Sequence, residues 1–481
     1  MGAYPNIRKS IITVAFGRGT MIVLQFASFI ILARMLSPED YGITAMLAIF
    51  ISVSAMLVDS GFGGSLIYQE RVDERDFSTV FWINILISST LYGLMFVLAD
   101  DIASFYNIPD IASYIRVLGL VVFFNSLGHI QFNQLYRNLE FNKINVVNLS
   151  SYLIAAIISI VLAYFHYGVW ALICQQVLYS VISTVIYVVI NRFRPKLFFS
   201  WNIVRKHWSY GSGLFFSTIT KTIYDNMYLQ LIGKYADVHN AGFFNQANKL
   251  KDIPATLFST TFDTSLFPVF SKIREEEVYA TKMRRVSSVF AFVCAPAFIL
   301  MGLLAKPIIM LLLGYKWIEA APLLSVLSVG AVFYILESVN RSGLKSKGQS
   351  MLLFKIDLLK RFLFILVMLA ALFAYGIYGL AFAYIINSFG GWVVNAVCLS
   401  RYVKYTFLSQ FIDVIKPILL SLLVAVIVYS VCTEPTHSNI LNIFIVSFVY
   451  IVMYALVNFI IRDSSMLFMI ETIKNKRLHV R

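Results

Sequence analysis

The chain has 481 residues and a net charge of +14 at pH 7, and 59% of its residues are hydrophobic while only 13% are charged. Charged residues make up about 25% of an average soluble domain. The composition therefore excludes a soluble globular protein, a disordered chain and a fibrous one, and it is typical of a helical protein that crosses a membrane many times. The basic excess then indicates basic cytoplasmic loops rather than a nucleic-acid surface.

About 14 segments are apolar over the roughly 20 residues that a helix needs to cross the hydrocarbon core. In chain order they cover residues 11–35, 41–58, 78–98, 112–134, 145–165, 168–190, 209–232, 241–270, 286–305, 320–340, 351–374, 376–400, 411–432 and 439–461. The eighth is the most polar, and Pro254 interrupts it. We therefore predict an all-α polytopic membrane protein.

Lysine and arginine alternate between the two sides of these spans. If the N-terminus is cytoplasmic, the outer loops hold only Lys234, Lys306 and Lys316, and the inner segments hold most of the other basic residues. Cytoplasmic loops carry such an excess, so we expect both termini to be cytoplasmic. Since no loop is long enough for a soluble domain, the spans themselves must carry the function.

The basic loop 191–208 separates six spans from eight, and the second group weakly repeats the first. Phe16–Gly19 resembles Tyr210–Gly213, and Leu36–Gly42 resembles Ala236–Gly242. Transporters are often built from internal repeats. We predict a six-helix lobe in residues 1–200, a second in residues 201–402, and two additional spans with a basic cytoplasmic tail in residues 403–481.

Charge at bilayer depth costs a few kcal/mol at least, so it usually faces a bundle interior or a wet cavity. The candidate cavity cations are Arg18, Lys221, Lys249, Lys251, Lys360 and Arg361. Such groups bind phosphate oxygens, which predicts an anionic ligand. The alternative is internal pairing, because Lys221 and Asp225 are four residues apart and Lys249 and Asp252 are three apart on their helices.

Several carboxylates lie in the same spans. Asp225, Asp252, Asp263 and Glu337 are candidates to couple H+ or Na+, because buried carboxylates can titrate near neutral pH. Their alternative role is simple charge balance for the lysines. Pro254 is either a hinge for alternating access or a static kink.

Motifs of enzymes and metal sites are absent from the sequence. The four cysteines are scattered, with no CxxC or Cys/His cluster, and there is no P-loop, HExxH or GxSxG motif. We therefore predict no metal site, no cofactor, no enzymatic activity and no ATP-driven motor. Energy would come from an ion gradient or from the gradient of the substrate.

Short segments resemble a known family in their order and spacing over roughly residues 10–320. They are Leu32–Leu36, Ser37–Gly42, Asp59–Gly63, Phe81–Asn84, Leu139–Lys143, Ala241–Asn245, Leu266–Phe270 and Leu313–Trp317. With them the chain resembles polysaccharide repeat-unit flippases of the Wzx type, in the MOP (MATE-like) superfamily, within the colanic-acid and teichuronic-acid exporter branch.

The resemblance implies a V-shaped two-lobe bundle that moves an undecaprenyl-pyrophosphate-linked oligosaccharide across the bacterial inner membrane. It serves synthesis of O-antigen, capsule or exopolysaccharide, in the setting of other polysaccharide-assembly proteins. In related flippases basic cavity residues hold the pyrophosphate, and Arg18 matches that pattern. The role of the lysines is inferred from their depth in the spans.

Two other functions remain to be weighed. The alternative is an ion-coupled MATE-type multidrug antiporter, whose cavity is expected to be acidic and aromatic, so the intramembrane lysines argue against it. A membrane polysaccharide polymerase or ligase is expected to carry a large outer loop with catalytic residues, whereas the outer loops here are short.

Overall fold

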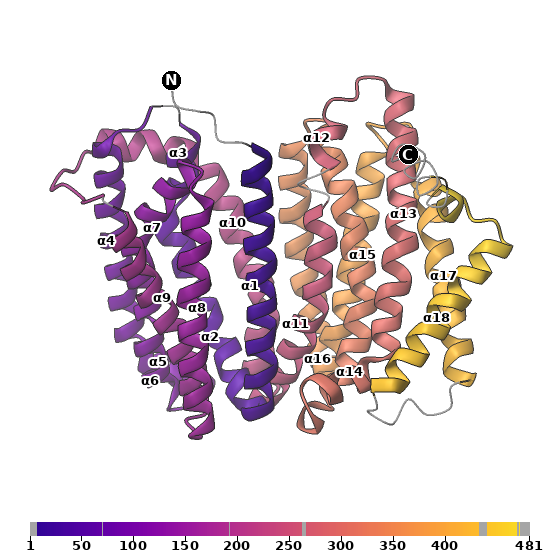
Figure 1. The fold of residues 1–481 in the computed structure, drawn as a ribbon, viewed down its shortest axis with the longest axis horizontal. Coiled ribbons are helices and arrows are strands. Elements are labelled where there is room, and N and C mark those ends of the chain that lie inside the picture. The colour runs from indigo at the N-terminus through magenta and orange to yellow at the C-terminus, as the bar shows by residue number, and fades with distance from the viewer. Residues whose placement is uncertain are drawn as a thin grey trace. The chain divides into compact units, whose positions relative to one another are not determined.

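The computed structural model describes residues 7–69, 71–191, 193–261, 266–431, 440–468 and 471, which are largely helical and contain no strand (Figure 1). The chain divides into two compact units, residues 1–242 and 243–481. The first unit contains α1 (Ile7–Met35), α2 (Pro38–Asp59), α3 (Phe62–Tyr68), α4 (Glu74–Val97), α5 (Ala99–Tyr106), α6 (Ile111–Leu118), α7 (Leu120–Arg137), α8 (Phe141–Tyr164), α9 (Val169–Ile190) and α10 (Trp201–Tyr235). α11 (Val238–Thr261) begins there and continues into the second unit, which adds α12 (Phe267–Phe270), α13 (Glu276–Leu303), α14 (Ala305–Leu312), the 3-10 helix η2 (Tyr315–Trp317), α15 (Ala320–Ser346), α16 (Ser350–Leu399), α17 (Phe407–Val431) and α18 (Ile440–Ile460).

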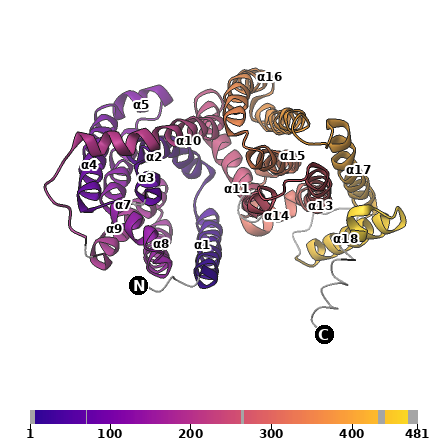
Figure 2. The same ribbon diagram turned by 90° about the horizontal axis from the view of Figure 1, so that it is seen from above.

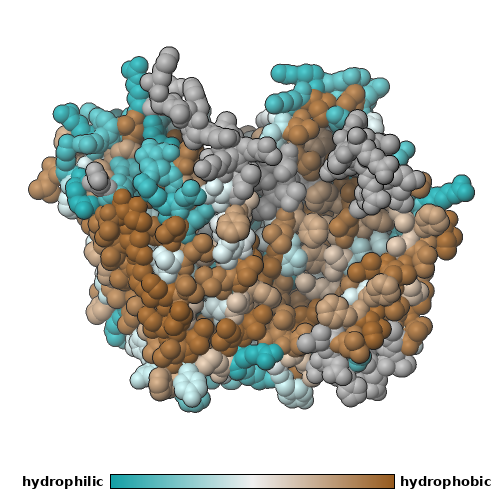
Figure 3. All heavy atoms as spheres, viewed as in Figure 1, coloured by the Kyte–Doolittle hydropathy of each residue, from teal (hydrophilic) through white to brown (hydrophobic). Residues whose placement is uncertain are grey.

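Within these described ranges, 11 helical stretches are long and apolar enough to cross a membrane. This confirms the prediction of an all-α polytopic membrane protein. In the view of Figure 3, a broad hydrophobic surface covers the helices of the first unit, and hydrophilic residues gather beyond the helix ends near α3. Such a surface suits contact with lipid.

The count of 14 spans stays a prediction. α10 and α11 have 35 and 24 residues, which is long enough to span a membrane, but they are more polar than the 11 apolar stretches. α16 counts once, although Gly376 has non-helical angles (φ 59°, ψ −141°) and divides it into two helices. This break falls at the first residue of the twelfth predicted span. Only glycine adopts such angles at little cost.

All of α10 belongs to the first compact unit, although the sequence places it in the second lobe. It packs against α2, α3 and α4, and the view from above shows it crossing the first unit beside them (Figure 2). At the crossing the backbones of Gly61 and Gly211 touch, because a Cβ on either glycine would overlap the carbonyl of the other. The predicted lobe boundaries themselves remain a prediction.

The first turns of α2 and α11 pack against each other reciprocally. A Cβ at Gly42 would overlap the carbonyl oxygen of Val238, and a Cβ at Gly242 would overlap that of Pro38. These glycines close the two similar turns, Leu36–Gly42 and Ala236–Gly242, that the sequence suggests are repeated. Only a residue without a side chain permits this backbone contact.

The second unit has a continuous apolar core. Phe298, Leu336 and Trp392 are almost fully buried, and they bring together α13, α15 and the second half of α16. Residues of α17 and α18, among them Val424 and Tyr450, join the same core. These contacts hold the polar residues of α15 and α16 in fixed positions.

Candidate functional site

Arg18 lies on α1 with an exposed side chain. Among the residues that the structure describes, no carboxylate pairs with it. One residue earlier, Gly17 brings α1 close to α8, since a Cβ there would overlap the side chain of Asn145. The Asn145 amide donates a hydrogen bond of 2.9 Å to the Thr13 carbonyl. α8 therefore fixes the helix that presents the Arg18 guanidinium.

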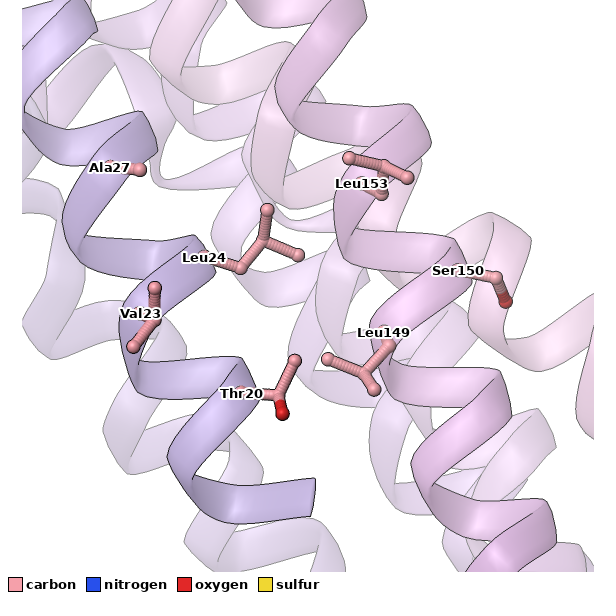
Figure 4. Close-up of a pocket in the computed structure, with 7 residues that line it drawn as sticks. All are labelled: Thr20, Val23, Leu24, Ala27, Leu149, Ser150 and Leu153. Atoms are coloured by element: carbon pink, nitrogen blue, oxygen red, sulfur yellow. The ribbon is translucent and has the colours of Figure 1, made fainter. Parts of the chain in front are cut away.

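A shallow pocket of about 430 Å³ lies between α1 and α8 (Figure 4). It is lined by Thr20, Val23, Leu24, Ala27, Leu149, Ser150 and Leu153, and this lining is almost entirely apolar. With 3.6 residues per turn, the α1 residues of this lining lie on the side of the helix opposite Arg18. The pocket suits a hydrocarbon chain and is separate from the cation.

Lys221 and Asp225 form an ion pair of 2.6 Å on one face of α10. Both side chains are about half exposed, at 61% and 48%. The structure thus contains the internal pairing that their spacing of four residues allows. Whether Lys221 contacts an anionic ligand or Asp225 couples an ion stays a prediction.

α11 carries a second polar cluster, in which Lys251 is 2% exposed. Its Nζ donates a hydrogen bond of 2.9 Å to the Tyr384 hydroxyl, lies 4.1 Å from the centre of that ring, and pairs with Asp252 at 2.9 Å. Asn248 donates to the other Asp252 oxygen at 2.8 Å. The buried ammonium is therefore compensated from two helices.

The neighbouring candidates on α11 lie differently. Lys249 is exposed, and Pro254 is half-buried within a helix that continues to Thr261. The hinge role of Pro254 and the ligand role of Lys249 stay predictions. Asp263, the remaining acidic candidate of this span, lies outside the described residues.

A charge cluster lies between α15 and α16, around the buried Glu337. The Glu337 carboxylate accepts hydrogen bonds from Lys360 Nζ and from the Asn395 amide at 3.0 Å, and Arg341 lies 3.9 Å away. Arg341 also pairs with Asp357. The cluster therefore holds two cations beside two carboxylates and balances its own charge.

Two features of this cluster depend on the tertiary structure. α15 continues to Ser346, so Arg341, which the sequence assigns to an inner loop, lies in the helix and reaches Asp357. A Cβ at Gly391 would overlap the Glu337 carboxylate, so the glycine leaves room for the cluster. Arg361, next to Lys360, is half-buried on α16. The ligand roles of Lys360 and Arg361 and the coupling role of Glu337 stay predictions.

A buried polar triad that the sequence did not predict joins α10 to α3 and α4. The His207 ring is fully buried, with Nδ1 2.8 Å from Ser65 Oγ and Nε2 3.0 Å from Asp76 Oδ1. Asp76 also caps α4 through a capping box with Asp73. Ser65 and Asp76 are buried too, so a substrate has no access, and we interpret the triad as a clamp that holds α10. The capping box was the one sequence signal for this position.

Replacing His207 by alanine is expected to lower the free energy of unfolding by about 1–3 kcal/mol, because Ser65 and Asp76 would lose a buried partner. Lys206→Ala serves as the control, since Lys206 lies 3.3 Å from the same carboxylate but is 45% exposed, so its loss should cost less. Thermal unfolding in detergent, followed by tryptophan fluorescence, measures both. Equal midpoints for His207→Ala and the unaltered chain would contradict the clamp.

The chain is similar to known proteins of polysaccharide biosynthesis. The family model described as "Polysaccharide biosynthesis protein" matches residues 31–322, and the model described as "Lipid II flippase MurJ" matches residues 226–454. The chain is 24% identical over 440 residues to the teichuronic acid biosynthesis protein TuaB of Bacillus subtilis (strain 168), covering 90% of this chain and 91% of that protein. It is 25% identical over 332 residues to the succinoglycan biosynthesis transport protein ExoT of Rhizobium meliloti (strain 1021), covering 69% and 67%.

Two solved structures share the fold. The lipid II flippase MurJ in an inward closed conformation matches with a TM-score of 0.73 at 18% identity, covering 94% of this chain and 100% of that one. An inward-facing multidrug resistance MATE family transporter of the MOP superfamily matches with a TM-score of 0.60 at 14% identity, covering 82% and 98%. These likenesses confirm the predicted MATE-like helical fold.

Proposed function

The chain belongs to the polysaccharide biosynthesis protein family, and on that premise we propose that it is a flippase for lipid-linked oligosaccharides. Its substrate is an undecaprenyl-pyrophosphate-linked repeat unit for a surface polysaccharide. The observation that carries the proposal is the family match over residues 31–322. The similarity to TuaB and ExoT, proteins of teichuronic acid biosynthesis and succinoglycan biosynthesis transport, supports the same substrate class.

The chemistry of the candidate cations fits this substrate. A pyrophosphate needs cationic hydrogen-bond donors that other groups have not already compensated. Of the candidates, Arg18 meets this requirement, since it is exposed and no described carboxylate pairs with it. Lys251 and Lys360 are already compensated by Asp252 and Glu337. We therefore assign the main phosphate contact to Arg18. A secondary contact from Lys249 and Arg361 is proposed from their depth in the predicted spans.

We place the protein in the bacterial inner membrane with both termini in the cytoplasm, as the alternation of basic loops favours. Transport would proceed by alternating access and would be driven by H+ or Na+ or by the gradient of the substrate. The protein would act without a cofactor and without chemical change of the substrate. Other polysaccharide-assembly proteins would supply the repeat unit and consume it.

Transbilayer movement of a polyprenyl-pyrophosphate oligosaccharide in proteoliposomes tests the proposal. We expect movement that requires the protein and slows about tenfold or more in Arg18→Ala, because a charge-assisted contact to phosphate is lost. Lys143→Ala is the control, as Lys143 pairs with Glu140 at the start of α8. Imposed proton and sodium gradients then identify the coupling ion.

Two outcomes would overturn the proposal. If the unaltered protein moves no polyprenyl-pyrophosphate oligosaccharide under any gradient, the flippase function is wrong. If it instead exports organic cations, the multidrug antiporter, which shares the fold, takes its place. If Arg18→Ala moves the oligosaccharide at the full rate, the flippase function stands, but the assignment of the phosphate contact to Arg18 is wrong.

A further inference from the structure

The segment between α9 and α10 presents apolar side chains outward. Leu197 is 93% exposed, Trp201 71% and Phe199 44%. The Phe199 and Trp201 rings pack edge to face with their centres 5.4 Å apart. We call these three exposed apolar side chains, which lie within five consecutive residues, the 197–201 wedge.

The backbone behind the wedge is fixed to α4. The Lys196 amide donates a hydrogen bond of 3.1 Å to Ser78 Oγ, and the Lys196 carbonyl accepts one of 2.9 Å from the Trp82 indole. The Phe193 and Phe77 rings lie 6.0 Å apart. The wedge is therefore held in its outward position by contacts on its inner side.

Basic residues precede and follow the wedge in the sequence. Lys196 is 68% exposed and pairs with Glu74 at 2.5 Å, and the Arg75 guanidinium lies 5.3 Å from the centre of the Phe198 ring. Arg194 and Arg205 are exposed. Arg205 lies four residues after Trp201, on the same face of α10, while Val204 and His207 are buried on the other face.

The position of the wedge in the fold indicates its partner. It follows the end of α9 at Ile190, and Lys196, directly before it, pairs with Glu74 at the start of α4. Both helices are candidate membrane spans. The wedge therefore lies where the hydrocarbon ends and the head groups begin. Aromatic side chains with nearby cations are the composition that binds this layer, and cations there attract anionic lipids.

We propose that the 197–201 wedge inserts into the bilayer surface and that Arg194 and Arg205 bind the head groups of anionic phospholipids. This site is separate from the proposed pyrophosphate contact at Arg18, and it does not depend on the flippase function. Its ligand is a bulk lipid of the surrounding leaflet. It holds the start of α10 at a fixed depth in that leaflet.

Quenching of Trp201 fluorescence by brominated lipids tests this proposal with the full chain in nanodiscs. The bromine is placed either on phosphatidylglycerol or on phosphatidylcholine, at the same mole fraction in a mixture of the two. The difference between the unaltered chain and Trp201→Phe isolates the Trp201 contribution from the other tryptophans. We expect this contribution to be quenched, and more strongly by the brominated anionic lipid.

Charge variants then test the head-group contact. Arg205→Gln is expected to lower the local enrichment of the anionic lipid about fivefold, the effect of one cation near an anionic surface, and high salt should weaken it further. Arg274→Gln, at an exposed cation between α12 and α13, is the control and should leave Trp201 quenching unchanged. An arm with brominated polyprenyl phosphate in place of phosphatidylglycerol separates bulk lipid from substrate.

Three results would overturn the proposal. If Trp201→Phe leaves the quenching unchanged, the wedge lies outside the hydrocarbon. If both brominated phospholipids quench Trp201 equally, its surroundings have no preference for anionic head groups. If only the polyprenyl phosphate quenches it, the surface is a substrate contact and not a bulk-lipid site.

Discussion

Lys360→Met should destabilise the protein by about 3–5 kcal/mol, because it leaves the Glu337 carboxylate buried without its main cation. The Lys360 and Glu337 side chains are only 12% and 11% exposed. The cation that remains, Arg341, lies 3.9 Å from Glu337 and already pairs with Asp357. Thermal unfolding in detergent, followed by tryptophan fluorescence, measures the loss.

The double variant Glu337→Gln/Lys360→Met tests whether the loss of stability in Lys360→Met comes from the unpaired Glu337 carboxylate or from other effects of the substitution. Removing both charges together is often neutral for stability, so we expect most of the loss to be recovered. Lys404→Met is the control at an exposed ion pair. Lys404 pairs with Glu277 at 3.4 Å, and the two side chains are 64% and 75% exposed. This substitution should therefore lower the free energy of unfolding by about 1 kcal/mol or less. A double variant as unstable as Lys360→Met would contradict a pairwise origin of the effect.

The same double variant decides whether this cluster takes part in transport. If Glu337 couples an ion or Lys360 contacts the substrate, the double variant folds but loses oligosaccharide movement in proteoliposomes. If the pair only joins α15 to α16, movement persists at a similar rate. Either result assigns Glu337 and Lys360 to a structural or to a functional role.

Alanine at Gly42 or Gly242 is expected to lower stability by about 1–3 kcal/mol each, since overpacking forces the backbone to shift. In both cases the new Cβ would meet a backbone carbonyl, of Val238 or of Pro38, and a carbonyl cannot swing aside as a long side chain can. Valine should cost more. The midpoint of thermal unfolding reports the change.

The reciprocal geometry of this contact makes a second, sharper prediction. One separation of the first turns of α2 and α11 would relieve both clashes, so the double alanine variant should cost less than the sum of the single ones. Gly93→Ala is the control, because a Cβ there meets nothing within 4 Å, and it should be neutral or slightly stabilising. Strict additivity of the two alanine substitutions would show that the turns do not move as one contact.

Local sequence spacing predicted one of the pairs that lie on a single helix, whereas Asp252, expected to pair with Lys249, pairs with Lys251. Lys221 and Asp225 are four residues apart, so a helix alone brings them together, and the structure has their ion pair. Pairs between helices could not be predicted from local spacing, because Lys360 and Glu337 are 23 residues apart in the sequence and His207 and Asp76 are 131 residues apart. Which helix faces meet is decided by packing of the apolar core, and no local pattern encodes it.

The amino-acid sequence by itself determined the helical membrane class and the family, because apolar spans of sufficient length and the order of short motifs are properties of the chain alone. It also marked Arg18 and the two similar turns at Gly42 and Gly242. Only the tertiary structure decided which intramembrane charges are compensated from another helix. Burial makes an unpaired charge costly, so Lys251 and Lys360 acquire partners on other helices, whereas Arg18 stays exposed.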